Sequence, residues 1–515
     1  MHPPTATYAA DGWDATALID LLHRGGLAVG GPRRVVRTVL DTFDGLLHGA
    51  GLRLTMVADG AHRTVALTGA GVVGVQVAVG QEPVWPDDLP AGPLRARVAA
   101  VVDVRALQPV LRITSVERDV ARADGRRKDV LRARLVDAST VRPGDVHLVP
   151  ATLLVVEPLA GYPKPAAELA DSLRAAGGGL TDDLVDLAAR AAGVDLAGYS
   201  SSPTVPLQPA MPALDGWCAV LANLAGTARA NWAGTLAQVD TEFLHELRVA
   251  VRRSRSILGH AKGVIPADVL VPASAAFAEI GAATGPARDF DVQLLAFPGQ
   301  LAQLSAAGAG DLDPVHALLV ERHRAAHAAL DAELTTPAVL DTLGRWEAWL
   351  ADPAHPGDRA TAPLAGAPLG AVVAKRIRKA HARVIADGRV ITPESEAESL
   401  HDLRKQAKKL RYLLECFASL LPATERKQFV KALKVLQDNL GEHQDAAVHV
   451  AQLHQAVDEL PADVPAATFV AIGQLIEQLD GRRQRARDEF AERFARYDST
   501  ATHEAFADVV AGIPR

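Results

Sequence analysis

Two stretches of the chain carry the same pattern of basic residues and histidine, 156 residues apart. Residues 244–258 read LHELRVAVRRSRSIL, and residues 400–414 read LHDLRKQAKKLRYLL. The Arg-Arg pair of the first copy becomes Lys-Lys in the second, so charge is kept where identity is not. Guanidinium and ammonium groups in series bind phosphate-like anions through charge-assisted hydrogen bonds. The repeat therefore predicts one anion-binding surface that is built twice.

Each copy is predicted to form an amphipathic helix. At about 100° per residue the basic positions share one face, while Leu244, Leu247, Val251 and Leu258 share the opposite face of the first copy. A single basic face is usually a solvated one. Crowded like charges cost energy on a helix, and their recurrence at a fixed spacing favours a polyanion site.

The candidate polyanion-binding residues of the repeat are five in each copy: His245, Arg248, Arg252, Arg253 and Arg255, and His401, Arg404, Lys408, Lys409 and Arg411. Two further groups of cations share helix faces near the second copy: Arg376, Lys379 and Arg383, and Lys431 and Lys434. These groups either converge with the repeat on one groove or are solvated faces.

Composition limits the function classes. The 515 residues carry a net charge of −7 and only 4% aromatic residues, which makes nucleic acid an unlikely partner. The two cysteines, Cys218 and Cys416, suggest neither a disulfide framework nor a cysteine metal site, and fit a reducing cytoplasm. We see no signal peptide and expect no membrane span.

The histidines of the helical part, including His316, His323 and His327, are expected to be surface or core residues without a metal. His245-Glu246 resembles the start of a zinc-binding HExxH motif, but Val249 stands where the second histidine would be. We expect no cofactor.

The domain organisation follows from a change in composition. Residues 1–200 hold short Val-rich runs, such as 35–40, 72–79, 98–104 and 153–156, which predict a sheet with a few helices. A Ser/Pro linker is expected at 201–212. An all-helical domain is expected at 213–512, with a first bundle at 213–350, a Pro/Gly/Ala connection at 351–370 and a second bundle at 371–512. The fold class is thus α+β.

The repeat resembles the signature of CHAD domains, the conserved histidine α-helical domains. The first copy is followed by Arg288-Asp289-x-Asp291-Val292; in the second, Gln444 replaces Arg288, Asp445 matches Asp289, and Ala447 replaces Asp291. The resemblance implies two four-helix bundles related by a pseudo-two-fold, with basic residues, Arg288 among them, lining a cavity that binds inorganic polyphosphate.

The first 200 residues resemble a CYTH domain, an antiparallel β tunnel for triphosphates, on residues 37–54 (RTVLDTFDGLLHGAGLRL) and 105–118. Active members carry an N-terminal ExExK motif for metal and phosphate. Here the first Glu is Glu82 and the first Lys is Lys128, so the motif is absent and the domain is expected to be degenerate. Five arginines either line the tunnel or face outward: Arg53, Arg112, Arg118, Arg132 and Arg134.

Two functions are therefore weighed. The favoured one is a non-catalytic polyphosphate-binding protein. Its expected location is the cytoplasm, with polyphosphate granules as one site of association. The alternative is a metal-dependent triphosphatase or polyphosphatase that uses Asp41, Asp44, Glu117 and Glu157 in the tunnel. The missing ExExK motif argues against catalysis. Oligomeric state and chain-length preference do not follow from the sequence.

Overall fold

The structure is a computed structural model that describes residues 5–10, 12–69, 72–141, 147–200, 205–302, 310–461 and 463–513. The chain divides into two compact units, residues 1–200 and 201–515. The expected linker at 201–212 begins at this division, and its residues 201–204 lie outside the described residues.

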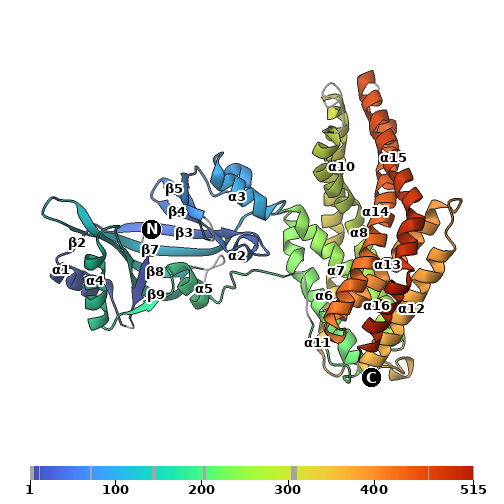
Figure 1. Ribbon diagram of the computed structural model, residues 1–515, viewed down its shortest axis with the longest axis horizontal. Coiled ribbons are helices and arrows are strands. Elements are labelled where there is room, and N and C mark those ends of the chain that lie inside the picture. Colours follow the sequence, from blue (N-terminus) through green and yellow to red (C-terminus); the bar gives the residue numbers. More distant parts are fainter. Residues whose placement is uncertain are drawn as a thin grey trace. The chain divides into compact units, whose positions relative to one another are not determined.

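The first unit is built on one antiparallel sheet of ten strands (Figure 1). Its order is β10-β1-β9-β8-β7-β3-β4-β5-β6, and β2 pairs with β7 beside this path. The strands are β1 (Ala6–Ala9), β2 (Ala28–Val29), β3 (Arg33–Asp41), β4 (Leu52–Asp59), β5 (His62–Gly69), β6 (Val72–Ala78), β7 (Gln108–Ala123), β8 (Asp129–Val141), β9 (His147–Glu157) and β10 (Gly179–Thr181). Such a sheet is consistent with a tunnel-like domain.

Short helices cover this sheet: α1 (Ala15–Arg24), α2 (Leu46–Gly49), α3 (Pro93–Val102), α4 (Pro163–Ala175), α5 (Leu184–Ala192) and the 3-10 turn η1 (Pro86–Asp88). Helices α1 and α4 share one apolar cluster with β7, β8 and β9, α3 shares a second with β4 and β5, and α5 packs on the middle strands. The sheet therefore has three small cores.

The strand predicted at 98–104 is wrong, because these residues belong largely to α3. Pro93 begins this helix, where a missing backbone N–H costs nothing. Leu94, Val98 and Val102 are all buried and lie four residues apart, so the Val-rich run follows a helical period.

The second unit is helical: α6 (Ala213–Leu236), α7 (Thr241–Gly259), α8 (Ala267–Leu301), α10 (Asp313–Leu334), α11 (Pro337–Ala351), α12 (Leu369–Arg389), α13 (Ala397–Cys416), α14 (Ala423–Glu459), α15 (Ala466–Tyr497) and α16 (Thr500–Ala511). Three 3-10 turns connect them: η2 (Gly310–Leu312), η3 (Arg359–Thr361) and η4 (Ala418–Leu420). The predicted α+β class is confirmed.

The helices repeat along with the sequence. Helices α6, α7 and α8 each begin 156 residues before α12, α13 and α14. Pro212 and Pro368, which cap α6 and α12, pair with each other in an antiparallel β-bridge. In the described residues each half adds a fifth helix, α11 or α16, to the four that were expected.

One apolar core joins the two halves. Trp217 of α6, fully buried, stacks at a tilt against Phe417 at the end of α13, with ring centroids 4.7 Å apart. A separate apolar cluster joins α8, α10, α14 and α15 at the end where α10 and α15 project in Figure 1. Helices α7 and α13 both belong to the larger core, the one with Trp217 and Phe417, and they pack against each other there.

Helix α8 is long and apolar enough to cross a membrane by length and composition alone. Of the most apolar stretch of 18 residues in this helix, 22% is buried. Here α8 packs against α7 and α10 and carries Arg288 and Asp291, both largely buried.

Candidate functional site

Helix α7 presents the first copy of the repeat as predicted. It begins after Asp240, whose carboxylate accepts hydrogen bonds from the backbone N–H groups of Glu242 and Phe243. Leu244, Leu247, Val251 and Leu258 are buried, so the apolar face predicted for this helix is confirmed. Its basic face is thereby turned away from the core.

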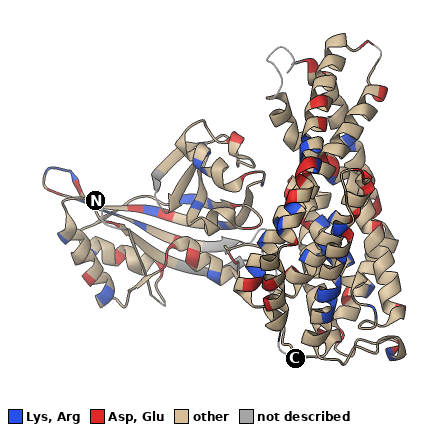
Figure 2. Cartoon of the chain, turned by 45° about the vertical axis from the view of Figure 1, so that its right-hand side comes forward, with Lys and Arg blue, Asp and Glu red and all other residues tan. Residues whose placement is uncertain are grey.

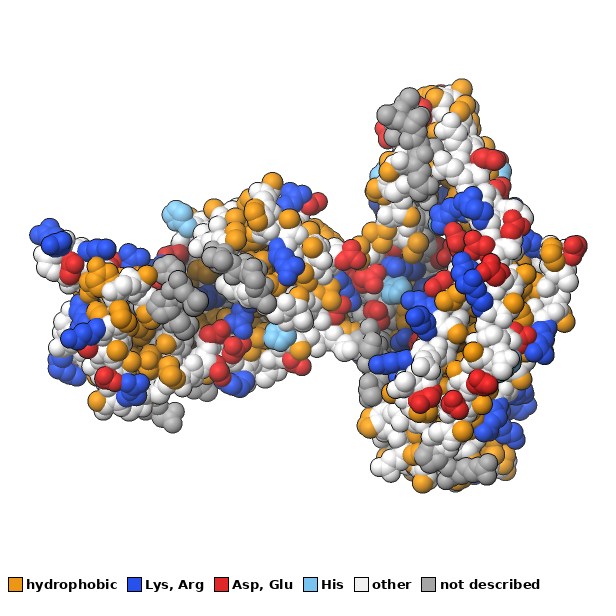
Figure 3. Space-filling model, viewed as in Figure 1, with side chains coloured by type: hydrophobic (Ala, Val, Ile, Leu, Met, Phe, Trp, Pro, Cys, Tyr) orange, Lys and Arg blue, Asp and Glu red, His pale blue; other side chains and the backbone are white. Residues whose placement is uncertain are grey.

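A cavity of about 510 Å³ brings the two copies together. Seven of the sixteen candidate residues line it: His245, Arg248, Arg252 and Arg288 from the first half, and His401, Arg404 and Lys408 from the second. Helices α8 and α14 complete the walls with Asp289, Val292, Gln293, Gln444, Asp445, Val448, His449 and Gln452. In the space-filling view, basic, acidic and His side chains gather midway along the visible face of this unit (Figure 3).

The cavity has an internal two-fold pattern. Arg248 Nη2 lies 3.8 Å from Asp289 Oδ1, and Arg404 Nη2 lies 3.1 Å from Asp445 Oδ1. Each guanidinium also lies against the aligned glycine of the facing helix. A Cβ on Gly285 would come within 3.2 Å of Arg248 Nη1. A Cβ on the aligned Gly441 would lie 3.8 Å from Arg404 Nη2, which is an ordinary contact, so the close approach disfavours a larger residue in the first half only.

The two halves differ at one pair of positions. Arg288 donates to the backbone oxygen of Thr241 at 2.8 Å and to Glu242 at 3.4 Å, so its charge is partly neutralised. Its counterpart Gln444 accepts a hydrogen bond of 2.9 Å from Nδ1 of His401. At this position the second half therefore has a neutral amide, Gln444, which binds His401, whereas the first half has the cation Arg288.

Like charges in the cavity are only partly offset. Burial, together with the charges of the neighbouring Arg404 and Arg252, lowers the pKa of Lys408 to about 7. Burial also lowers the pKa of Arg248, against the opposing charge of Asp289. In turn, burial raises the pKa of Asp289, and the charge of Asp445 adds to this. Cations from both halves therefore lie together in this cavity, with Asp289 and Asp445 beside them.

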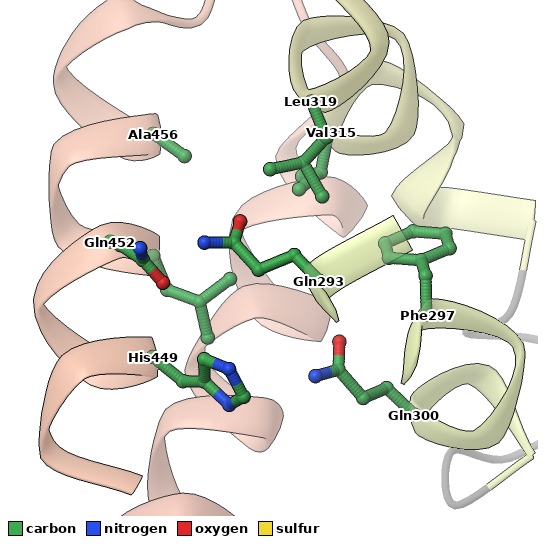
Figure 4. Close-up of a pocket in the computed structure, with 9 residues that line it drawn as sticks. Gln293, Phe297, Gln300, Val315, Leu319, His449, Gln452 and Ala456 are labelled. Carbon is green, nitrogen blue, oxygen red and sulfur yellow. The ribbon is translucent and has the colours of Figure 1, made fainter. Parts of the chain in front are cut away.

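A smaller cavity adjoins the first and shares Gln293, His449 and Gln452 with it. Figure 4 shows these side chains facing one another between α8 and α14, with Gln300 nearby. The amides extend the groove with neutral hydrogen-bond donors and acceptors. Sequence reasoning missed His449 and the glutamines. The sequence did carry a signal for them: Gln293, His449 and Gln452 follow the aligned aspartates Asp289 and Asp445 by one or two helical turns on α8 and α14.

Nine candidate residues do not line the cavity. They are Arg253, Arg255, Arg376, Lys379, Arg383, Lys409, Arg411, Lys431 and Lys434. Arg253 and Arg411 form ion pairs with the same carboxylate, Glu415. Arg383 pairs with Asp387, and Arg376 donates to the backbone oxygen of Lys262. The rest are exposed. The basic arc of α7 and α13 is wider than this cavity, so Arg253, Arg255, Lys409 and Arg411 lie on the same two helices but outside its lining.

Three of these excluded cations surround a histidine outside the cavity. Burial lowers the pKa of His260 to about 4, and the charges of Arg376, Lys409 and Lys379 contribute in the same direction. His260 is thus a neutral residue at physiological pH, beside a cationic patch on α12 and α13.

The arginines considered for the tunnel are mostly paired with carboxylates. Arg53 pairs with Asp183 and Asp186, Arg112 with Glu82, Arg132 with Asp129, and Arg134 with Glu157. Arg118 is half-buried. Figure 2 shows Lys and Arg interspersed with Asp and Glu in this unit. These four arginines are therefore partly neutralised.

The four carboxylates of the alternative function have structural partners. Asp41 accepts hydrogen bonds from the backbone N–H groups of Thr42, Leu47 and His48. Asp44 pairs with Arg105, Glu117 with Arg37, and Glu157 with Arg134. Among the described residues, the groups of His, Cys, Asp and Glu close enough to share a metal both lie in the helical unit: Asp291-His323-His327 and Glu242-His245-Glu246.

Comparison with known proteins identifies the helical unit. Residues 219–454 match the sequence model of the CHAD domain, so this part of the chain is a CHAD domain, as the repeat predicted. A solved CHAD domain from the plant Ricinus communis is similar over 59% of this chain and 95% of its own, with 24% identity and a TM-score of 0.45. PptA from Streptomyces chartreusis is similar over 55% of this chain and 99% of its own, with 17% identity and a TM-score of 0.44. No curated protein sequence matches this chain.

Proposed function

We propose that the helical unit binds inorganic polyphosphate in the cavity between the two repeat copies, without catalysis. One observation carries this proposal: α7 supplies Arg248 and Arg252, and α13 supplies Arg404 and Lys408, to the same cavity. An anion that reaches all four must be extended and must carry charge along its length. A single phosphate would leave part of this charge uncompensated.

The chemistry of the lining favours polyphosphate over nucleic acid. Arginine binds phosphate oxygens in a bidentate manner, and lysine adds a point charge. Proteins that bind single-stranded nucleic acid generally add aromatic platforms on which bases stack. Among the described residues, those that line this cavity include no Phe, Tyr or Trp. A cytoplasmic location, with polyphosphate granules as a place of association, belongs to the same proposal.

The direct test is equilibrium binding of long-chain polyphosphate to the full chain. Arg252→Ala combined with Lys408→Ala removes one cavity cation from each half. Arg383→Ala combined with Lys431→Ala removes the same charge from exposed positions outside the cavity. We expect the first pair to weaken binding at least about tenfold, or 1.4 kcal/mol, and the second to change it little. Equal losses would show that binding follows net charge and not this cavity.

The first unit is proposed to be a companion without hydrolytic activity. Metal-dependent phosphoryl transfer needs carboxylates free to hold the cation, whereas Asp41 caps backbone groups and Glu117 is held by Arg37. A phosphate-release assay with tripolyphosphate and long-chain polyphosphate, in Mg²⁺ and in Mn²⁺, tests this. Phosphate release by the unaltered chain that requires the metal would support the triphosphatase instead.

A further inference from the structure

A second cluster in the helical unit, outside the polyphosphate cavity, has the composition of a metal site. Asp291 of α8 faces His323 and His327 of α10, which lie four residues apart on one face of their helix. The Nε2 atoms of both histidines lie 2.9 Å from Oδ1 of Asp291. Asp291 and His327 are buried, and His323 is partly exposed.

We infer that Asp291, His323 and His327 bind a divalent d-block cation such as Zn²⁺ or Co²⁺. Two imidazoles and one carboxylate are a ligand set that such cations accept, with bonds of about 2.0–2.2 Å. Ligand atoms of a tetrahedral site are then about 3.3 Å apart. Both Nε2 atoms lie 2.9 Å from Asp291 Oδ1, and all three atoms lie within 4.8 Å of one another, so a cation requires side-chain movement but no new neighbours.

The second oxygen of the carboxylate supports the inference. Asp291 Oδ2 is buried and has no hydrogen-bond partner among the described residues. The guanidinium Nη1 of Arg288 lies 4.0 Å from this oxygen. Buried carboxylates are normally fully hydrogen-bonded, paired or bound to a metal. An oxygen in this state is available to a cation held between the helices.

The internal repeat shows that the fold does not need this cluster. In the aligned helix α14 the position of Asp291 is taken by Ala447. At the same offset, His323 corresponds to Leu479, which is buried. The second half thus packs this helix pair without the carboxylate. A costly buried acid that is kept in only one half needs a reason other than packing.

A bound cation would link α8 to the middle of α10. His323 is the most exposed of the three ligands, so a solvent molecule can complete the coordination from its side. Three protein ligands with a solvent molecule in the fourth position leave the coordination sphere open on one side. We assign no reaction to this cation.

The test uses the full chain after treatment with a chelator. Titration with Zn²⁺ should show one site, Co²⁺ should give the visible absorption of a low-symmetry site with nitrogen ligands, and Zn²⁺ should raise the melting temperature. Asp291→Ala copies the residue of the second half, and His323→Gln removes a ligand but keeps an N–H donor for Asp291. Each should weaken binding at least tenfold and abolish the Co²⁺ absorption.

Two further variants separate this site from others. His316→Gln lies on the same helix, against the ring of Phe297, and should bind the cation as the unaltered chain does. His245→Gln disrupts the other possible ligand group and should also bind normally. If the unaltered chain binds neither cation, the cluster is only a hydrogen-bonded one and the inference is wrong. It is equally wrong if His245→Gln abolishes the Co²⁺ absorption while Asp291→Ala keeps it.

Discussion

The guanidinium Nη2 of Arg404 lies 3.1 Å from Oδ1 of Asp445, and this ion pair repeats the contact between Arg248 and Asp289 in the first half. In both halves an aspartate of the long helix, α8 or α14, forms an ion pair with an arginine that the proposed polyanion would bind. The carboxylates therefore compete with the proposed ligand. They also lower the cost of leaving the cavity unliganded.

This competition gives the first prediction. Asp289→Asn combined with Asp445→Asn should tighten polyphosphate binding, by roughly tenfold at low salt, because two negative charges leave the cavity. Isothermal titration with a single long-chain preparation measures it. A matched control is Asp387→Asn, which removes an acid paired with Arg383 outside the cavity. Weaker binding in the double variant would mean that the aspartates orient the arginines more than they oppose the anion.

The second prediction concerns pH and Lys408. Because burial and neighbouring cations lower its pKa to about 7, the free cavity holds this lysine half-protonated near neutrality. A polyanion favours the charged form, so binding should take up protons, and affinity should fall as pH rises from 6 to 9.

Other titratable groups share the cavity: His245, His401, His449, Asp289 and Asp445. Lys408→Arg isolates the lysine, since arginine stays charged throughout this range. The slope of affinity with pH should become shallower between pH 7 and 9. An unchanged slope would show that Lys408 does not carry the proton uptake.

Salt and chain length provide the third prediction. A chain that contacts both halves displaces several counterions, so the logarithm of the association constant should fall steeply with the logarithm of salt concentration. Long polyphosphate should bind much more tightly than pyrophosphate, since one chain engages both copies at high effective concentration. A flat salt dependence, or equal affinity for both ligands, would contradict a shared cavity.

The fourth prediction concerns the first unit. Burial alone would raise the pKa of Glu117, but the hydrogen bond and charge of Arg37, with Ser115 and Arg134, outweigh it, and the pKa is lowered. The resulting stabilisation is present above the unfolded value of about 4.3. It should be lost as pH falls below that value toward the lowered pKa.

Glu117→Gln should destabilise this unit at neutral pH by about 3–5 kcal/mol, because it leaves the charge of Arg37 buried and uncompensated. Urea unfolding followed at pH 7 and at pH 4 measures both effects. Polyphosphate binding in native buffer should stay unchanged. A variant as stable as the unaltered chain would show that the buried pair contributes little.

The sequence alone was enough for the α+β class and the duplicated helical part, because both depend on local patterns. Period and composition distinguish helix from strand over long segments, and a gap-free offset of 156 residues reveals a repeat without any structure. Local patterns failed where they were short, as at 98–104, where Val98 and Val102 belong to a helix.

The membership of the site needed the tertiary structure. A helical wheel places Arg252 and Arg255 on one face. Only the packing of the helices decides that Arg252 lines the cavity, whereas Arg255 is exposed and lies beside Gly281. Likewise, spacing within α10 puts His323 and His327 together, yet nothing local indicates Asp291 between them. Helix periodicity fixes angles about one axis, whereas a binding site depends on how separate axes are placed, and long-range contacts determine that placement.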